Sequence, residues 1–134
     1  MSTAPLLQTI DLTARFGDRV LYKELNLCLD FDRVALVGRN GVGKTTLLKS
    51  IMGLSKTSSA TITYNGQDIS DKPTELRACE GIGYVPQGRE IFTQLSVEEN
   101  LRVGLLARGD GLREIPLFIF EIFPALKEML HRRG

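Results

Sequence analysis

Gly38 to Thr45 is the part of the sequence whose residue types and spacing could do chemistry, because it has the pattern of a loop that binds phosphate. It reads G-R-N-G-V-G-K-T and matches G-x-x-x-x-G-K-[ST] at every fixed position. Gly38, Gly41 and Gly43 can take backbone angles that a Cβ would block, so consecutive N–H groups can turn inward around phosphate oxygens. We expect Lys44 to reach the β- and γ-phosphates of a nucleoside triphosphate, and the Thr45 hydroxyl to ligate Mg²⁺.

The elements on either side of this loop should hold it in place. Val34–Val37 is a continuous apolar run directly before the loop, and it predicts a strand buried on both faces of a parallel sheet. After the loop, apolar residues recur at helical spacing, at Leu47, Leu48, Ile51, Met52 and Leu54. Gly53 can end this helix, whose positive N-terminal end near Lys44 would face the phosphates. The alternative, a glycine-rich turn before a capped helix, does not explain Lys-Thr at the last two motif positions.

The composition is that of one ordinary globular domain. The chain has 134 residues, of which 43% are hydrophobic and 25% charged, and its formal net charge is +1. This charge argues against bulk electrostatic capture of nucleic acid or of an anionic membrane. Cys28 and Cys79 have no partners at metal-ligand spacing, so we expect free thiols. Met1–Pro5 is no signal peptide and Ile115–Phe120 is too short to cross a bilayer, which predicts a cytosolic or peripheral protein.

Turn residues predict two β-hairpins. Residues 6–29 contain two apolar-rich stretches with Gly17-Asp18 between them, and residues 60–69 alternate before turning at Asn65-Gly66. A helix is expected over about Pro73–Cys79, followed by a strand at Ile82–Val85.

The last third of the chain predicts helices. Ser96 and Glu99 form a capping box for a helix that runs through Ala107. Glu98 and Glu99 are not a paired-carboxylate site, because adjacent residues on a helix point in different directions. From Ile115 onward there is an apolar stripe, most of which we expect in the core: Phe118, Ile122, Phe123, Leu126, Met129 and Leu130. Pro124 should start or kink the second part of this segment, and His131 with its two arginines should be a solvated helix end.

Three stretches of the sequence together resemble one known family. The loop "GRNGVGKTTLL", the run "GIGYVPQGREIFTQLSVEENL" from Gly81 to Leu101 and the ending "FPALKEMLHRRG" are similar to the ATPase subunits of ABC transporters. Within that family they most resemble the branched-chain amino acid and urea subgroup, with the ending closer to the urea type.

The resemblance implies an α/β fold of the P-loop NTPase class, namely the N-terminal half of an ABC ATPase domain. It implies an antiparallel β subdomain, a partial parallel sheet with helices, and the start of a helical subdomain, over residues 1–33, 34–87 and 88–134. It further implies an ATP-binding subunit that energises an importer. The partners would be a second ATPase subunit, head to tail, and transmembrane permease subunits on the cytoplasmic face of the bacterial inner membrane. Neither nucleic acid nor the solute would be bound.

The resemblance also extends the site beyond the loop. Phe16 would stack on adenine where relatives usually have Tyr, although a packing role in the hairpin is the alternative. Gln87 would approach Mg²⁺ and the γ-phosphate with its loop sensing the membrane subunits, the alternative being an exposed loop amide. The implied catalytic residues are Lys44 and Gln87, and the implied Mg²⁺ ligands are Thr45 and Gln87. The implied ATP-binding residues are Phe16, Gly38, Arg39, Asn40, Gly41, Val42, Gly43, Lys44, Thr45 and Thr46.

The sequence departs from the family pattern in several places. The Ser-Gly-Gly signature, the strand ending in Asp-Glu and the switch histidine do not occur, and Phe31-Asp32 stands where relatives usually have a Gly-Glu turn. We therefore expect an incomplete, truncated domain that binds ATP with little hydrolysis. A catalytically inactive nucleotide-binding fragment or decayed paralogue is the alternative. An ABC protein of DNA repair or translation is disfavoured, and a small GTPase lacks support because no Asn-Lys-x-Asp occurs.

Overall fold

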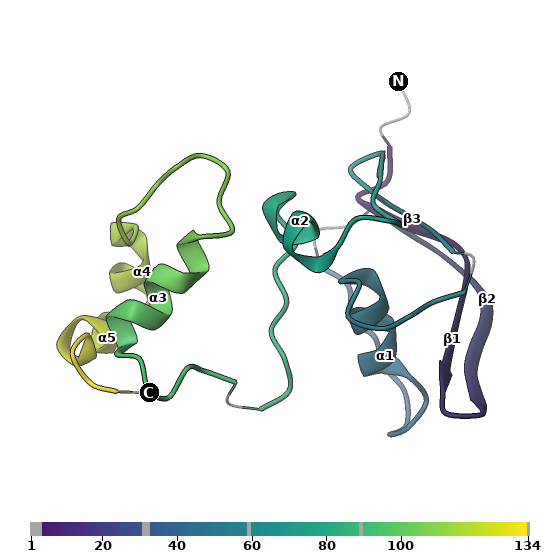
Figure 1. Cartoon of the computed structure of the whole chain (residues 1–134), viewed down its shortest axis with the longest axis horizontal. Helices are drawn as coiled ribbons and strands as arrows, with labels where there is room; N and C mark the ends of the chain where they lie inside the picture. Colours follow the sequence, from purple (N-terminus) through teal and green to yellow (C-terminus); the bar gives the residue numbers. More distant parts are fainter. Residues whose placement is uncertain (1–3, 31–32, 59, 89, 134) are drawn as a thin grey trace. The chain divides into compact units, whose positions relative to one another are not determined.

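The computed structural model describes residues 4–30, 33–58, 60–88 and 90–133. The chain divides into two compact units, Met1–Arg77 and Ala78–Gly134. The first unit is an antiparallel sheet with a helix, and the second is built from short helices (Figure 1).

The sheet of the first unit has four strands in the order β2-β1-β3-β4, and each neighbouring pair is antiparallel. Its strands are β1 Leu7–Phe16, β2 Arg19–Leu29, β3 Thr61–Tyr64 and β4 Gln67–Asp68. Gly17 turns the first hairpin with φ 57°, and Asn65 and Gly66 turn the second with φ 48° and 76°. Two successive residues with positive φ give the second turn the geometry that suits the twist of a hairpin, and both predicted hairpins are confirmed.

The pairing of β1 with β2 in the long first hairpin shifts register three times, and hydrogen bonds from backbone amides to side chains support the first two shifts. The first shift lies between Thr9 and Leu12, the second between Leu12 and Ala14, and the third between Ala14 and Arg15. At the first two shifts, Asp11 and Glu24 have φ of 53° and 52°. The Asp11 amide donates to Asn26 Oδ1 at 2.9 Å, and the Glu24 amide donates to the Thr13 hydroxyl at 2.9 Å. Bulges of this kind increase the local twist of the strands, here in the part of the hairpin that leads to Phe16 at the end of β1.

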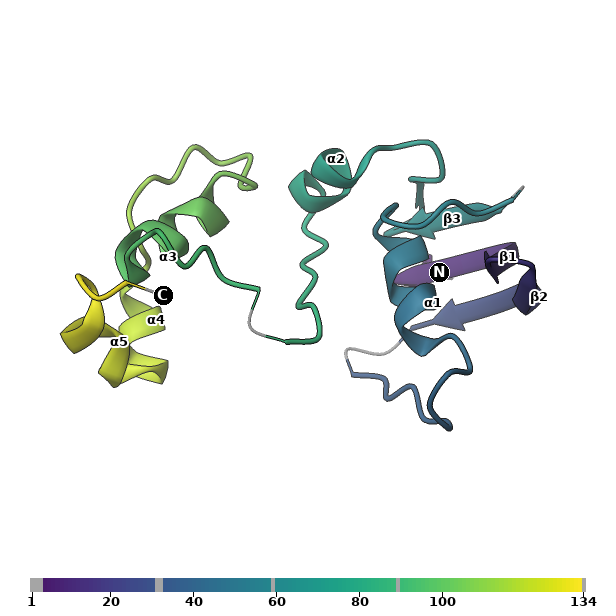
Figure 2. The same cartoon turned by 60° about the horizontal axis from the view of Figure 1, so that its bottom comes forward.

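Helix α1, Lys44–Ile51, lies on one face of this sheet (Figure 2). The buried apolar side chains of the unit come from the strands, from α1 and from the turns next to them: Leu12, Ala14, Leu47, Ile51, Met52, Ile62 and Ile69. The helix ends at Gly53, which has φ 75°; its amide donates to Ser50 O and the Leu54 amide to Lys49 O. This pair of bonds is a Schellman motif, so the predicted helix and its glycine stop are confirmed.

Neither the buried strand predicted at Val34–Val37 nor the strand predicted at Ile82–Val85 is formed. Residues 33–39 and 82–86 have no regular structure, and Val37 and Val85 are 90% and 91% exposed. An apolar run becomes a central parallel strand only when neighbouring strands bond to both of its edges. Among the described residues every strand belongs to the antiparallel sheet, so nothing there pairs with either run. The atypical turn expected at Phe31-Asp32 lies outside the described residues.

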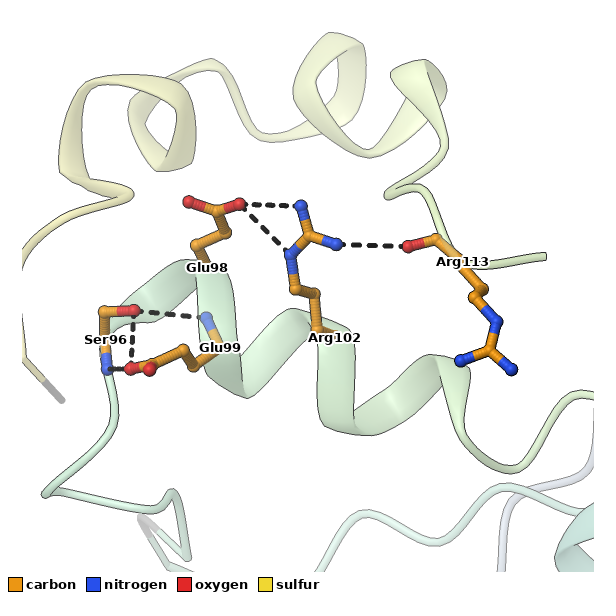
Figure 3. A network of polar contacts seen from close by, with 5 residues as sticks. All are labelled: Ser96, Glu98, Glu99, Arg102 and Arg113. Atoms are coloured by element: carbon orange, nitrogen blue, oxygen red, sulfur yellow. Dashed lines mark hydrogen bonds and ion pairs between the residues drawn. The ribbon is translucent and has the colours of Figure 1, made fainter.

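The helices of the later part agree with the predicted signals. They are α2 Thr74–Cys79, α3 Val97–Leu105, α4 Leu117–Ile122 and α5 Pro124–Met129. Ser96 caps α3 in a complete capping box with Glu99 (Figure 3), and Pro124 begins α5. The core expected for the apolar stripe is wrong for Phe118, Ile122 and Phe123, which are more than half exposed. Short helices bury only part of their surface, and Leu126, Met129 and Leu130 are half-buried.

Candidate functional site

The glycine loop ends at Gly43, where backbone and packing both require glycine. Gly41 and Gly43 have φ of 82° and 101°, a region that side chains disfavour. A Cβ on Gly43 would also lie 3.3 Å from Leu21 Cβ and 3.4 Å from the ring of Tyr22. The loop therefore passes close against β2 just before α1 begins.

Gly38 is needed for a different reason from the one the motif predicts. Its φ lies outside the left-handed region, so the expectation that it uses an angle barred to other residues is wrong. A Cβ at Gly38 would instead come within 3.2 Å of Val42 Cγ2. Gly38 thus leaves room for the side chain of Val42.

The start of α1 presents backbone donors, and no side chain in the described part of the chain caps them. Gly43 is the N-cap residue and has no side chain to cap the helix, and no acidic residue lies in the first turn. The first amides of a helix have no carbonyl partner within it, and they carry the positive end of its dipole. The Leu47 amide, which donates to Gly43 O at 2.9 Å, closes the first turn. The amides before it belong to Lys44, Thr45 and Thr46, three of the predicted ATP-binding residues.

The Lys44 ammonium lies within the loop. Its Nζ donates to Gly38 O at 2.5 Å and to Arg39 O at 2.8 Å. A positive charge is therefore held by carbonyl oxygens at the entrance to α1, beside the free amides of the first turn. The bond from Lys44 to Gly38 joins the seventh position of the motif to the first. The ammonium group and the helix amides beside it suit the binding of an anion.

A chain of hydroxyl groups, which no motif in the sequence indicated, anchors α1 to the sheet. Ser50 Oγ donates to Thr46 O at 2.8 Å, and it lies 3.2 Å from the Tyr22 hydroxyl. Because Ser50 has used its only proton, the Tyr22 hydroxyl must be the donor in the second bond. Burial raises the pKa of Tyr22, which keeps this phenol protonated. A serine four residues after Thr46 in a helix was the one local signal for this bond.

Three more predicted site residues are Thr45, the last residue of the loop motif, and Phe16 and Gln87, which lie outside the motif. Phe16 ends β1 and is 77% exposed, which gives no support to the alternative that it packs in the hairpin. Thr45 is exposed in the first turn of α1. Gln87 belongs to the second unit, where it is exposed on an irregular segment. Roles for these three in nucleotide or Mg²⁺ binding stay predictions. Among the described residues, no helix has both the length and the apolar character needed to cross a membrane.

Comparison with known sequences gives consistent matches. The profile of the family described as ABC transporter matches residues 22–132. The chain is 41% identical over 137 residues to the probable branched-chain amino acid transport ATP-binding protein LivF of Archaeoglobus fulgidus, covering 96% of this chain and 56% of that protein. It is 36% identical over 102 residues to the high-affinity branched-chain amino acid transport ATP-binding protein BraG of Pseudomonas aeruginosa, covering 75% and 44%. The chain thus spans about half the length of these curated relatives.

Comparison with solved structures agrees with the sequence matches. An ATP-binding subunit of an ABC transporter superposes with a TM-score of 0.75 at 29% identity, covering 96% of this chain and 54% of the other. A nucleotide-free ATP-binding cassette superposes with a TM-score of 0.73 at 22% identity, covering 96% and 57%, which supports the fold alone.

Proposed function

Because this chain belongs to the ABC transporter family and has the fold of its P-loop ATPases, we propose that it binds ATP and Mg²⁺ as the ATP-binding part of an importer. The observation that carries the proposal is the loop from Gly38 to Lys44, where a glycine turn, uncapped helix amides and one ammonium group converge. A triphosphate is the ligand whose charge and shape these groups suit.

The residues that are present fit this ligand. The first-turn amides of α1 would donate to phosphate oxygens, and no side chain competes for them. Lys44 would exchange the carbonyls of Gly38 and Arg39 for phosphate, which is a stronger acceptor because it is charged. The Thr45 hydroxyl, in the first turn of α1, would hold Mg²⁺, which neutralises phosphate charge when bound, and the resemblance of its segment to the family makes Gln87 the proposed second ligand. Phe16, exposed at the tip of the hairpin, would offer its ring face to adenine.

The cargo and the assembly are part of the proposal. The names of two relatives concern branched-chain amino acid transport, and this favours branched-chain amino acids over urea or short amides. Permease subunits and a second ATP-binding subunit would be the partners, at the cytoplasmic face of the membrane. A nucleotide-binding role without turnover is the alternative, and the rate of phosphate release separates the two.

Nucleotide binding and turnover test the proposal together. Isothermal titration should show Mg²⁺-dependent ATP binding that Lys44→Ala weakens by about tenfold or more, because a charged hydrogen bond is lost. Lys49→Ala is the matched control, since Lys49 is an exposed lysine in the last turn of the same helix. Equal affinity of the wild type and Lys44→Ala would overturn the assignment of the loop. Phosphate release that depends on Lys44 would favour the ATPase, and its absence would favour the binding role.

A further inference from the structure

We propose that Arg77 is a positioning residue that connects the phosphate-binding helix α1 to the segment that carries Gln87. The inference rests on the proposed function, because it concerns the effect of phosphate binding at the N-terminal end of α1.

Arg77 is a buried arginine that binds carbonyl oxygens on two separate segments. Arg77 is only 4% exposed, although it lies in the short helix α2. Nη1 donates to Ile51 O at 2.6 Å and to Ser50 O at 3.1 Å, at the C-terminal end of α1. Nε donates to Lys72 O at 2.8 Å and Nη2 to Ser70 O at 2.7 Å, just before α2. One planar guanidinium therefore joins α1, the turn after β4 and α2.

The charge of Arg77 is compensated mainly by carbonyl dipoles. The last carbonyls of a helix have no partner within it and carry the negative end of its dipole, so a cation at this end is favourable. Burial lowers the pKa of Arg77, and the charge of Asp71 acts in the opposite direction. The packing is close, since a Cβ on Gly53 would lie 3.2 Å from Arg77 Cζ and Nε. Arg77 thus fits the end of α1 both electrostatically and sterically.

Arg77 lies between the phosphate-binding helix α1 and the segment that leads to Gln87. Helix α1 has eight residues, so it is about 12 Å long. Its first residue is Lys44, in the phosphate loop, and its last is Ile51, held by Arg77. Helix α2 ends at Cys79, two residues after Arg77, and the irregular segment to Gln87 begins there. A displacement of α1 on phosphate binding would therefore be passed through Arg77 to the start of the Gln87 segment.

A purely structural role for Arg77 makes a different prediction. If Arg77 only stabilises the first unit, a variant that still folds should respond to nucleotide in both regions as the wild type does. If Arg77 positions the Gln87 segment, its loss should separate the two responses. Arg77→Lys keeps the charge but lacks the fork that reaches four carbonyls at once.

Hydrogen exchange of the full chain, read by mass spectrometry with and without Mg²⁺ and a non-hydrolysable ATP analogue, measures both responses. In the wild type we expect slower exchange at residues 41–48 and altered exchange at residues 80–88. Arg77→Lys should keep the loop response and reduce the response at 80–88 by about threefold or more. Arg19→Lys, at an exposed arginine in β2, is the control and should behave as the wild type.

A second variant keeps the test decisive if Arg77→Lys is poorly folded. In Arg77→Ala, millimolar ethylguanidinium should occupy the vacated space and restore the response at residues 80–88. No loop response in the wild type would overturn the proposed function and this inference with it. A wild-type loop response without one at 80–88, or an unchanged response at 80–88 in a folded Arg77→Lys or an unrescued Arg77→Ala, would overturn this inference alone.

Discussion

The ammonium group of Lys44 donates to the carbonyl oxygen of Gly38 at 2.5 Å, which joins the start of α1 to the first residue of the glycine loop. The cation that the motif assigns to phosphate therefore already lies inside the loop, held by neutral acceptors. Phosphate oxygens can replace these carbonyls without moving the charge into a new environment.

Gly41 and Gly43, the two loop glycines with positive φ, should differ in how they tolerate a methyl group. Gly41→Ala brings only the strain of its φ, about 1–2 kcal/mol, because a Cβ there meets nothing within 4 Å. Gly43→Ala adds contacts with Leu21 and Tyr22, so it should lower the free energy of unfolding further and weaken ATP binding more. Urea denaturation and titration with ATP on both variants check this order. Equal losses would contradict the close approach to β2.

The hydroxyl of Tyr22 should contribute to the stability of the first unit through its bond to Ser50. Tyr22→Phe removes the donor from the part-buried pair and should lower the free energy of unfolding by about 0.5–1.5 kcal/mol. Urea denaturation monitored by circular dichroism measures the loss. Tyr64→Phe is the matched control, a half-buried tyrosine in β3, and it should cost less. A larger loss in the control would show that the hydroxyl chain does not anchor α1.

The ring of Phe16 should matter for the base and not for the phosphates. If it stacks on adenine, Phe16→Ala should lose about 1–3 kcal/mol of binding to ATP. Binding of inorganic triphosphate should stay unchanged, since it has no base. Phe16→Tyr should retain ATP affinity because the ring is kept. Comparable losses for ATP and triphosphate would indicate that Phe16 acts on the loop and not on adenine.

The capping box of α3 should make this helix sensitive to acid. The Ser96 amide and hydroxyl donate to Glu99 Oε2 at 2.7 and 2.9 Å, and these bonds lower the pKa of Glu99 (Figure 3). Because the pKa of Glu99 is lower in the folded state than in the unfolded state, ionised Glu99 stabilises the fold at pH values above its unfolded pKa, near 4.3. This stability is lost as the pH falls through the pKa of Glu99 in the folded state. Helical circular dichroism of the wild type should fall across this window.

Ser96→Ala is the variant that isolates the cap. It should lower helix stability by about 1 kcal/mol near neutral pH and reduce the acid dependence. Ser55→Ala, at a half-buried serine in a loop of the first unit, serves as control. An acid transition in Ser96→Ala identical to that of the wild type would contradict the role of this pair.

Local sequence signals predicted the elements whose stabilising interactions lie within a few residues. The Schellman end of α1 at Gly53, the Asn65-Gly66 turn and the Ser96 cap each depend on neighbours no more than five positions away. The spacing of the phosphate loop is equally local, which is why it could be read with the start of its helix. For Gly38, spacing identified the residue but not the reason that glycine is needed there.

The sequence by itself determined the phosphate loop, the helix behind it and the hairpins, since turns and helix ends form through short-range hydrogen bonds. Only the tertiary structure decided that Tyr22 meets Ser50 across 28 residues and that Arg77 reaches Ile51 across 26. It also decided that Val34–Val37 has no strand partners among the described residues and stays irregular. These outcomes depend on which distant segments pack together, and no local pattern of residues specifies that.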